Sequence, residues 1–206
     1  MNERWMGASA AKAAEEIRKS ASAIRLRNMD VSSVSLVRTH VEKVRLRPAM
    51  AIDEAAFKLA MSHFASGVTV VTTEHAGRPY GMTVASFASL SLRPPLVLIC
   101  IEKSVKTHEA IIGARKFGVS ILSDMQADIS SRFASRSDDK FSGVKTNRGQ
   151  LGIPLIAEAL TTLECEVRDQ LPGGDHTIFV GEVVDVVTRE GIPLLYFRSG
   201  YREMQR

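Results

Sequence analysis

The chain has 206 residues, of which 45% are hydrophobic, so it is long enough for one globular domain with a sizeable core and is not a disordered chain. The net charge of +4 comes from residues 1–48, which hold ten Lys and Arg against five Asp and Glu. Because this excess forms no basic stripe interleaved with aromatic residues, we expect no nucleic-acid binding. The longest apolar runs, 94–101 and 178–180, are far shorter than the roughly 20 residues of a membrane helix, so we expect no membrane span.

Residues 1–49 are expected to be a basic N-terminal extension, helical or poorly ordered, ahead of a globular domain at 50–206. Ala, Glu, Lys and Arg favour a helix at 8–27, and 31–37 is typical of a short strand or a link. Acidic residues argue against a transit peptide, and the alternative is that Met50 is the natural start. We expect the extension to be dispensable. Loss of folding or activity on its deletion would contradict this.

The globular region opens with an expected helix that Asp53 precedes as N-cap. Its apolar periodicity is Phe57, Met61 and Phe64. A β-branched stretch at 68–73, a turn at 74–79 and a returning stretch at 80–86 predict a β-hairpin.

Further strands and two helices follow along the chain. The strands are predicted at 96–101, 117–122, 161–168, 177–187 and 194–197. The helices are predicted at 106–112 and 125–134, the second capped by Ser123 or Asp124. Strands at short spacing with few helices favour an antiparallel barrel or sandwich over a parallel sheet.

Several common site patterns are missing from the sequence. No G-x-G-x-x-G follows a first strand and there is no Walker sequence, so a nucleotide would be held by another device. The His and Cys residues show no metal-ligand spacing, and no G-x-S-x-G marks a nucleophile, so we expect no metal. Cys100 and Cys165 are expected to be reduced, buried thiols of a cytoplasmic protein. Glu164 and Glu166 resemble paired carboxylates, but alternation with apolar neighbours predicts that both face solvent.

Three segments offer binding chemistry, each with a purely structural alternative. Residues 81–91 (GMTVASFASLS) are small and hydroxyl-rich, which suits close approach to a flat ring or merely decorates a strand edge. Residues 102–107 (EKSVKT) open a helix with cations, hydroxyls and free amides, which suits a phosphate, although Ser104 could simply cap the helix. Residues 173–181 (GGDHTIFVG) place His176 before a buried strand, as a general acid, a metal ligand, a contact for a planar ligand or hydrogen-bonded structure.

A series of sequence blocks runs in order over roughly 70% of the chain, from about residue 57 to 201. The blocks are FASGVTVVT (64–72), GMTVASF (81–87), SLSLRPPLV (89–97), SVKT (104–107), FGVSIL (117–122), RFA (132–134), LEC (163–165), GDHTIFVG (174–181) and PLLYF (193–197). Together they resemble the signatures of the short-chain flavin reductase family, the reductase components of two-component flavin monooxygenases. The N-terminal extension has no counterpart in that pattern.

This resemblance implies a mainly β fold, an FMN-binding split β-barrel of Greek-key type with flanking helices. It implies that residues 83–86 lie along the isoalloxazine edge, and that Ser104 and Thr107, with Lys103 or Lys106, hold the flavin phosphate. The implied cofactor-binding residues are Thr83, Val84, Ala85, Ser86, Ser89, Ser91, Lys103, Ser104, Lys106, Thr107, Arg132, Phe133, Asp175 and His176. Of these, Arg132 and Phe133 would contact the adenine half of a dinucleotide or the outer flavin face.

The implied activity is the reduction of FMN or FAD with NADH or NADPH, by a homodimer that supplies reduced flavin to a partner monooxygenase. His176 is the catalytic candidate: with Asp175 it would border the nicotinamide, and it would orient the carboxamide or a ring edge without being an obligate proton donor. The residues do not choose between the two flavins or between the two nicotinamides. Two alternatives stay open: a reductase that passes electrons to a corrinoid or iron chelate, and a non-catalytic flavin-binding carrier or sensor.

Overall fold

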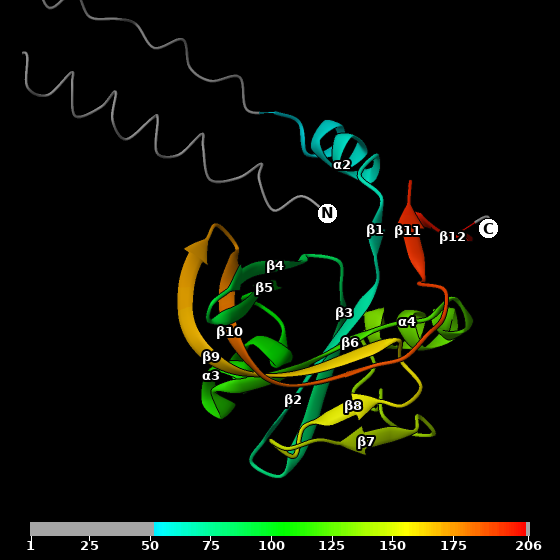
Figure 1. Ribbon diagram of the computed structural model, residues 1–206. Helices are drawn as coiled ribbons and strands as arrows, with labels where there is room; N and C mark the ends of the chain where they lie inside the picture. Colours follow the sequence, from blue (N-terminus) through cyan, green and yellow to red (C-terminus); the bar gives the residue numbers. More distant parts are fainter. Residues whose placement is uncertain (1–51, 205–206) are drawn as a thin grey trace, which may run out of the picture. The chain divides into compact units, whose positions relative to one another are not determined.

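The computed structural model describes residues 52–204, and the segments 8–27 and 31–37 for which a helix and a strand are predicted lie outside them. The described residues form antiparallel sheets with short flanking helices (Figure 1). The helical elements are α2, Glu54–Ser62; α3, Lys106–Ala114; the 3₁₀ turn η2, Asp124–Gln126; and α4, Ala127–Ala134. Within this part of the chain, no helix has the length and apolar character to cross a membrane.

Seven strands form one antiparallel sheet in the order β3-β2-β6-β9-β10-β5-β4. Their bounds are β2, Thr69–His75; β3, Arg78–Val84; β4, Phe87–Leu92; β5, Pro95–Glu102; β6, Lys116–Ile121; β9, Thr161–Gly173; and β10, His176–Thr188. A three-stranded sheet joins β1, Ser66–Gly67; β11, Leu195–Phe197; and β12, Gly200–Arg202, and a two-stranded sheet pairs β7, Thr146–Arg148, with β8, Pro154–Ile156.

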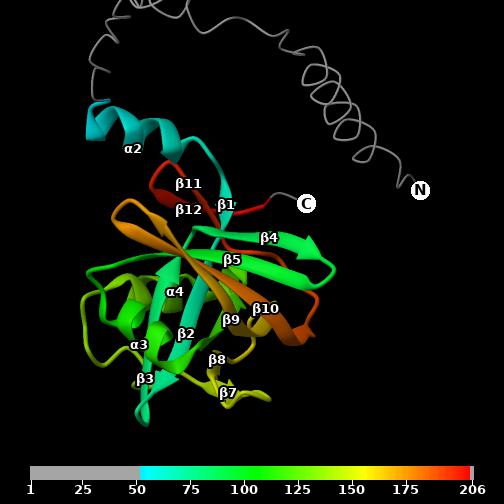
Figure 2. The ribbon, with the colours of Figure 1, turned by 90° about the vertical axis from the view of Figure 1, so that its left-hand side faces the viewer.

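The large sheet curls into a barrel that is not fully closed. Strand β3, at one edge, contacts β5, which is next to the other edge, without pairing with it (Figure 2). The mainly β split barrel and the predicted strands and helices are therefore confirmed. Strand β4 and the short strands β1, β7, β8 and β12 lie outside the predicted strands.

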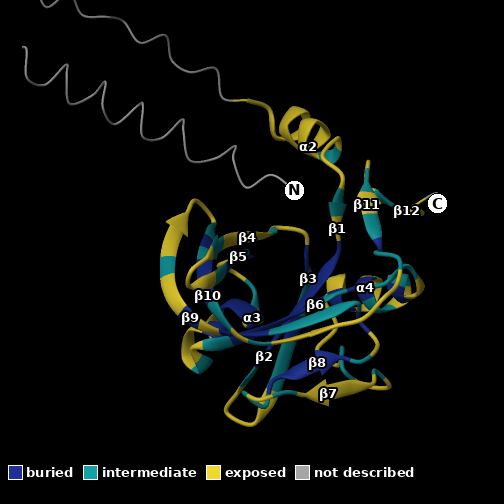
Figure 3. Cartoon of the chain, in the orientation of Figure 1, coloured by how far each residue is buried: buried dark blue, intermediate teal, exposed yellow. Residues whose placement is uncertain are grey.

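Strand β2 separates two apolar clusters, and this explains its β-branched sequence. Its residues are buried on both faces from Thr69 to Thr73 (Figure 3). Val71 packs in a cluster with Phe117 on one side, and Val70 packs in a second cluster with Phe133 on the other. Because α3 adds Ile111 to the first cluster and α4 carries Phe133, burial of apolar surface fixes both helices beside β3.

Helix α2 begins directly after Asp53, as predicted, but the Asp53 side chain makes no capping hydrogen bond. The apolar residues of its periodicity do not pack against the rest of the described chain. Phe57, Met61 and Phe64 are 56%, 54% and 76% exposed (Figure 3). Within the described residues, α2 and Phe64 therefore present an uncovered apolar surface.

The prediction that Glu164 faces solvent is wrong, whereas Glu166 is exposed as predicted. The Glu164 carboxylate is fully buried and accepts the backbone N–H groups of Leu151 at 2.9 Å and Ile153 at 3.2 Å. These bonds compensate the desolvation of the carboxylate and tie the loop before β8 to the barrel. Burial and the neighbouring Glu164 raise the pKa of the Cys165 thiol to about 12, so this free cysteine is protonated and unreactive. Cys100 is also a free thiol, but it is only half-buried.

We expect Glu164→Ala to lower the free energy of unfolding by about 2–4 kcal/mol, because it leaves two backbone N–H groups without their buried acceptor. Glu166→Ala, two residues along the same strand and exposed, is the matched control and should change stability by less than about 0.5 kcal/mol. Urea unfolding of both variants measures the difference. Equal effects would contradict the role given to Glu164.

Candidate functional site

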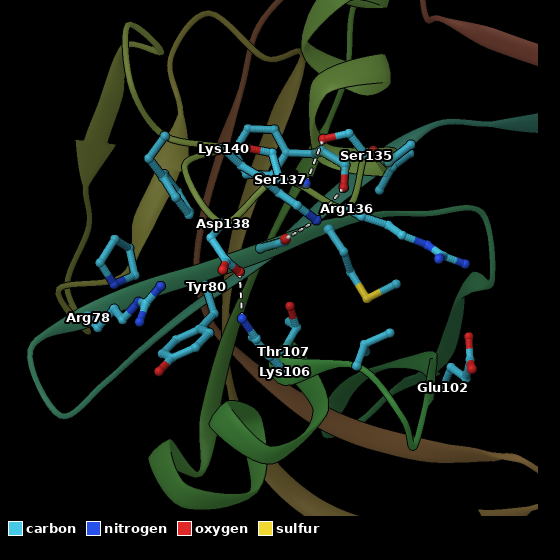
Figure 4. A pocket seen from close by; sticks show the side chains of 18 of the residues that line it. Arg78, Tyr80, Glu102, Lys106, Thr107, Ser135, Arg136, Ser137, Asp138 and Lys140 are labelled. Carbon is cyan, nitrogen blue, oxygen red and sulfur yellow. Dashed lines mark hydrogen bonds and ion pairs between the residues drawn. The ribbon is translucent and has the colours of Figure 1, made fainter.

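A cavity of about 550 Å³ opens between β3, the start of α3, and the end of α4 with the loop that follows it (Figure 4). Its lining residues are Arg78, Pro79, Tyr80, Gly81, Met82, Thr83, Glu102, Ser104, Val105, Lys106, Thr107, Phe133, Ala134, Ser135, Arg136, Ser137, Asp138, Lys140 and Phe141. The walls combine apolar side chains with a cluster of hydroxyl and charged groups. Such a lining suits an organic ligand that has a flat apolar part and an anionic end.

The start of α3 provides the polar end of the cavity. No side chain caps this helix: its N-cap residue is Val105, and the Ser104 hydroxyl instead donates to the carboxylate of Glu102. The alternative in which Ser104 caps the helix is therefore wrong. Lys106 and Thr107 follow in the first turn, where backbone N–H groups have no partner within the helix. Hydroxyls, a cation and free amides at one place are the groups that bind phosphate.

Residues 135–142 form a loop along the opposite side of the cavity. From this loop Asp138 accepts a hydrogen bond from Nζ of Lys106 across the opening, at 2.6 Å (Figure 4). Lys140 Nζ donates to the carbonyls of Gly81 at 3.3 Å and Phe133 at 3.0 Å, and burial lowers its pKa. Phe141 packs edge-on against Phe133, with 5.0 Å between ring centroids. The loop is therefore held against α4 and β3 by specific contacts.

Asp175, in the turn between β9 and β10, and His176, the first residue of β10, lie beside Glu102 and Lys103 near the start of α3, on a rim that is outside the lining of the cavity. Gly174 has φ of +70°, a conformation that glycine adopts without strain, and the pairing of His176 with Glu102 fixes the turn at the end of β5. Lys103 donates from its backbone N–H to the carbonyl of Asp175 at 3.0 Å and from Nζ to the carbonyl of Gly174 at 2.6 Å.

Asp175 and His176 form a hydrogen-bonded pair on this rim. His176 Nδ1 lies 2.7 Å from the Asp175 carboxylate, and this hydrogen bond, with the charges of His176 and Lys103, holds the pKa of Asp175 below its usual value. An ionised carboxylate only accepts, so Nδ1–H donates to Asp175 and Nε2 is left for a ligand. The Asp175–His176 pair stands at the entrance of β10 and is not buried in the barrel.

The structure brings five of the predicted site residues to the cavity and leaves the others outside its lining. Thr83, Ser104, Lys106, Thr107 and Phe133 line it. Val84 packs in the core, Ala85 and Ser86 are exposed after β3, and Ser89 and Ser91 lie on β4. The guanidinium of Arg132 points to the loop and donates to the carbonyl of Ser142. The Thr83 hydroxyl donates to the carbonyl of Ser130 at 2.6 Å, so toward a ligand it can act only as an acceptor.

Sequence reasoning missed the lining residues that come from the start of β3 and from the loop after α4. The polar members of this set are Arg78, Tyr80, Ser135, Arg136, Ser137, Asp138 and Lys140. The charged run that directly follows the RFA block was a usable signal for the loop residues. No signal in the sequence marked Arg78 and Tyr80, because only the pairing of β3 with β2 places them beside α3.

His108 joins α3 to β10 behind the cavity. The side chain is 8% exposed, its Nε2 lies 2.8 Å from the hydroxyl of Thr177, and its ring packs edge-on against Phe179 at 5.5 Å. Burial lowers the pKa of His108, so the ring is neutral. Because Thr177 follows His176 directly, this contact fixes the start of α3 relative to His176.

Comparison with known proteins decides the family. The sequence profile of the flavin reductase like domain matches residues 61–205. The reductase component of a 4-nitrophenol 4-monooxygenase/4-nitrocatechol 2-monooxygenase from Rhodococcus opacus is 45% identical over 150 residues, which cover 73% of this chain and 80% of that protein. The chain belongs to the flavin reductase family.

A second relative and a solved structure of flavin reductases agree with this assignment. The reductase component of a 4-hydroxyphenylacetate 3-monooxygenase from Thermus thermophilus is 41% identical over 150 residues, 72% of this chain and 95% of that protein. The NADH:FAD oxidoreductase SgcE6 of Streptomyces globisporus, solved with NAD and FAD fragments, matches with a TM-score of 0.72 and 38% identity, covering 74% of this chain and 93% of that one. The resemblance seen in the sequence is confirmed, and the chain is an oxidoreductase.

His108 should make this flavin reductase less stable in acid. Because burial lowers its pKa, the unfolded chain binds a proton that the folded chain does not, and stability falls as the pH drops below the usual histidine value of about 6.5. Replacing His108 with Gln should make the decline in Tm between about pH 7.5 and pH 5.5 shallower. A variant with the same decline as the original chain would contradict this assignment.

Proposed function

We propose that this flavin reductase transfers a hydride from NADH or NADPH to FMN or FAD and supplies the reduced flavin to a partner monooxygenase in the cytoplasm. The observation that carries the proposal is the cavity, in which apolar walls meet the cationic, hydroxyl-bearing start of α3. The names of the relatives, reductase components of monooxygenases, support the same activity and the same kind of partner. The complex of SgcE6 with NAD and FAD fragments supports the use of both cofactor classes.

The residues present fit a flavin. Met82 and Phe141, both partly buried, provide apolar surface for the ring system, Phe133 is buried behind Phe141, and Thr83 stands at the end of β3 beside them. Lys106, Thr107 and the first amides of α3 would hold the phosphate, with Ser104 and Lys103 close by. The flavin and nicotinamide supply the redox chemistry, so the chain needs no nucleophile or metal, and its work is to orient both rings and exclude water.

His176 is proposed to position the nicotinamide. Since Asp175 accepts the hydrogen bond of Nδ1–H, Nε2 is the ring nitrogen left to hydrogen-bond the nicotinamide carboxamide. The turn that carries His176 is tied to Lys103 and lies next to the proposed phosphate subsite. Asp175 therefore acts through His176, by fixing its tautomer and orientation.

We further propose that the chain is a homodimer that uses its exposed apolar surface. Besides α2, the far half of β10 exposes Val186 and Val187 at 56% and 48%, and β4 exposes Leu92 at 91%. Exposed apolar side chains on a sheet and a helix are typical of a subunit interface. Because β4 also carries Ser89 and Ser91, a second copy on this surface would bring the interface close to the predicted flavin contacts.

For a homodimer, light scattering should give a molecular mass of twice the 22.5 kDa of one chain.

The activity is tested by mixing the purified chain with FMN or FAD and with NADH or NADPH, and following the nicotinamide absorbance. We expect oxidation that depends on added flavin. In His176→Ala the KM for the nicotinamide should rise about tenfold, the loss of one hydrogen bond of roughly 1.5 kcal/mol, while the KM for flavin stays the same. No turnover with any pair of cofactors would contradict the proposed function. An unchanged nicotinamide KM and rate would contradict only the role of His176.

A further inference from the structure

The Lys106–Asp138 ion pair lies where the proposed function needs a free cation. Lys106 belongs to the proposed phosphate subsite, yet its Nζ is 2.6 Å from the Asp138 carboxylate, which reaches it from the other side of the cavity (Figure 4). We propose that Asp138 is an internal counter-ion that competes with the flavin phosphate for Lys106 and so determines how strongly the protein favours phosphate-bearing flavins over riboflavin. The inference rests on the proposed function, because it assigns a specificity role at the same site.

The loop that carries Asp138 is built to hold it at this position. Arg132, in the last turn of α4, closes the base of the loop from both ends: its carbonyl accepts the Ser135 hydroxyl at 2.7 Å and its guanidinium donates to the carbonyl of Ser142. Within the loop, the backbone N–H of Asp139 donates to the Ser137 hydroxyl at 3.2 Å. Lys140 fastens the far side through the carbonyls of Gly81 and Phe133. These hydrogen bonds hold the loop in place, with Asp138 facing α3.

The cations around Asp138 would bind a phosphate, which carries more negative charge than a carboxylate, more strongly than they bind Asp138. Besides Lys106, both Arg78 and Lys140 are close enough to favour its ionised form, and these charges with the Lys106 hydrogen bond lower the pKa of Asp138. All three cations line the cavity, and Glu102 is the other acid among the lining residues. A phosphate monoester carries about −1.5 to −2 at pH 7, so it gains more from the same cations than one carboxylate does.

Breaking the Lys106–Asp138 ion pair when a phosphate binds costs little free energy. The side chains of Lys106 and Asp138 are 68% and 66% exposed, and exposed pairs of this kind are weak. Their strength corresponds to at most about a fivefold change in an equilibrium constant. Asp138 therefore lowers the affinity for FMN modestly, through competition for Lys106 and repulsion of the phosphate. Riboflavin has no phosphate and brings no charge that Asp138 could oppose.

The test is a titration of FMN and of riboflavin, followed by quenching of flavin fluorescence, with the full chain, Asp138→Asn and Asp139→Asn. Asp139 is the matched control, since it is the next residue of the same exposed loop and is not among the cavity-lining residues. We expect Asp138→Asn to lower the Kd for FMN about two- to fivefold and to leave the Kd for riboflavin unchanged. The gain should shrink at high ionic strength, because salt screens exposed charges. Asp139→Asn should change neither Kd.

Three results would overturn the inference and leave the proposed function standing. The first is an unchanged or weaker FMN affinity in Asp138→Asn, and the second is an equal change for FMN and riboflavin, which would mean that Asp138 only shapes the loop. The third is the same gain in Asp139→Asn, which would reflect the general charge of the loop. A full chain that binds neither flavin would overturn the proposed function and this inference together. A chain that binds both flavins without an effect of Asp138 would overturn the inference alone.

Discussion

The pairing of β10 with β5 is the constraint on which the site depends. Its register sets His176 against Glu102, so the turn at the start of β10 lies beside the residues that lead into α3. The backbone bond from Lys103 to the carbonyl of Asp175 extends that pairing by one step beyond the strands. As a result, the proposed nicotinamide contact lies beside the residues that lead into the proposed phosphate subsite, although Lys106 and His176 are 70 positions apart in the sequence.

The large sheet curls at β10, where the strand packs closely on the Phe117 ring. The register of β10 with β9 shifts between Val180 and Gly181, and a Cβ on Gly181 would lie 2.4 Å from the Phe117 ring. The strand therefore bends over a buried aromatic side chain at a residue that has no side chain of its own. Beside the same apolar cluster, the His108–Thr177 contact fixes α3 against this strand. The site is thus supported by the core on which it stands.

The sequence predicted the parts of the fold that apolar pattern alone determines. The β-branched stretch that became β2 is buried between two apolar clusters, and the apolar runs of β5, β6 and β10 contribute residues to the first of them. Glu164 was misplaced because its partners are the amides of Leu151 and Ile153, in a loop whose path depends on the finished barrel. For the same reason, no local pattern showed that Arg78 and Asp138 face one cavity. The flavin contacts were predicted from family resemblance, and only some of them line that cavity.

The central claim is that the start of α3 binds the phosphate of a flavin whose ring lies in the cavity between β3 and the loop after α4. The most direct measurement is the Kd for FMN and for riboflavin in Lys106→Met. Loss of a hydrogen bond to a charged phosphate should weaken FMN binding about tenfold or more and leave riboflavin binding unchanged. Equal weakening of both flavins, or no change in either, would contradict the claim.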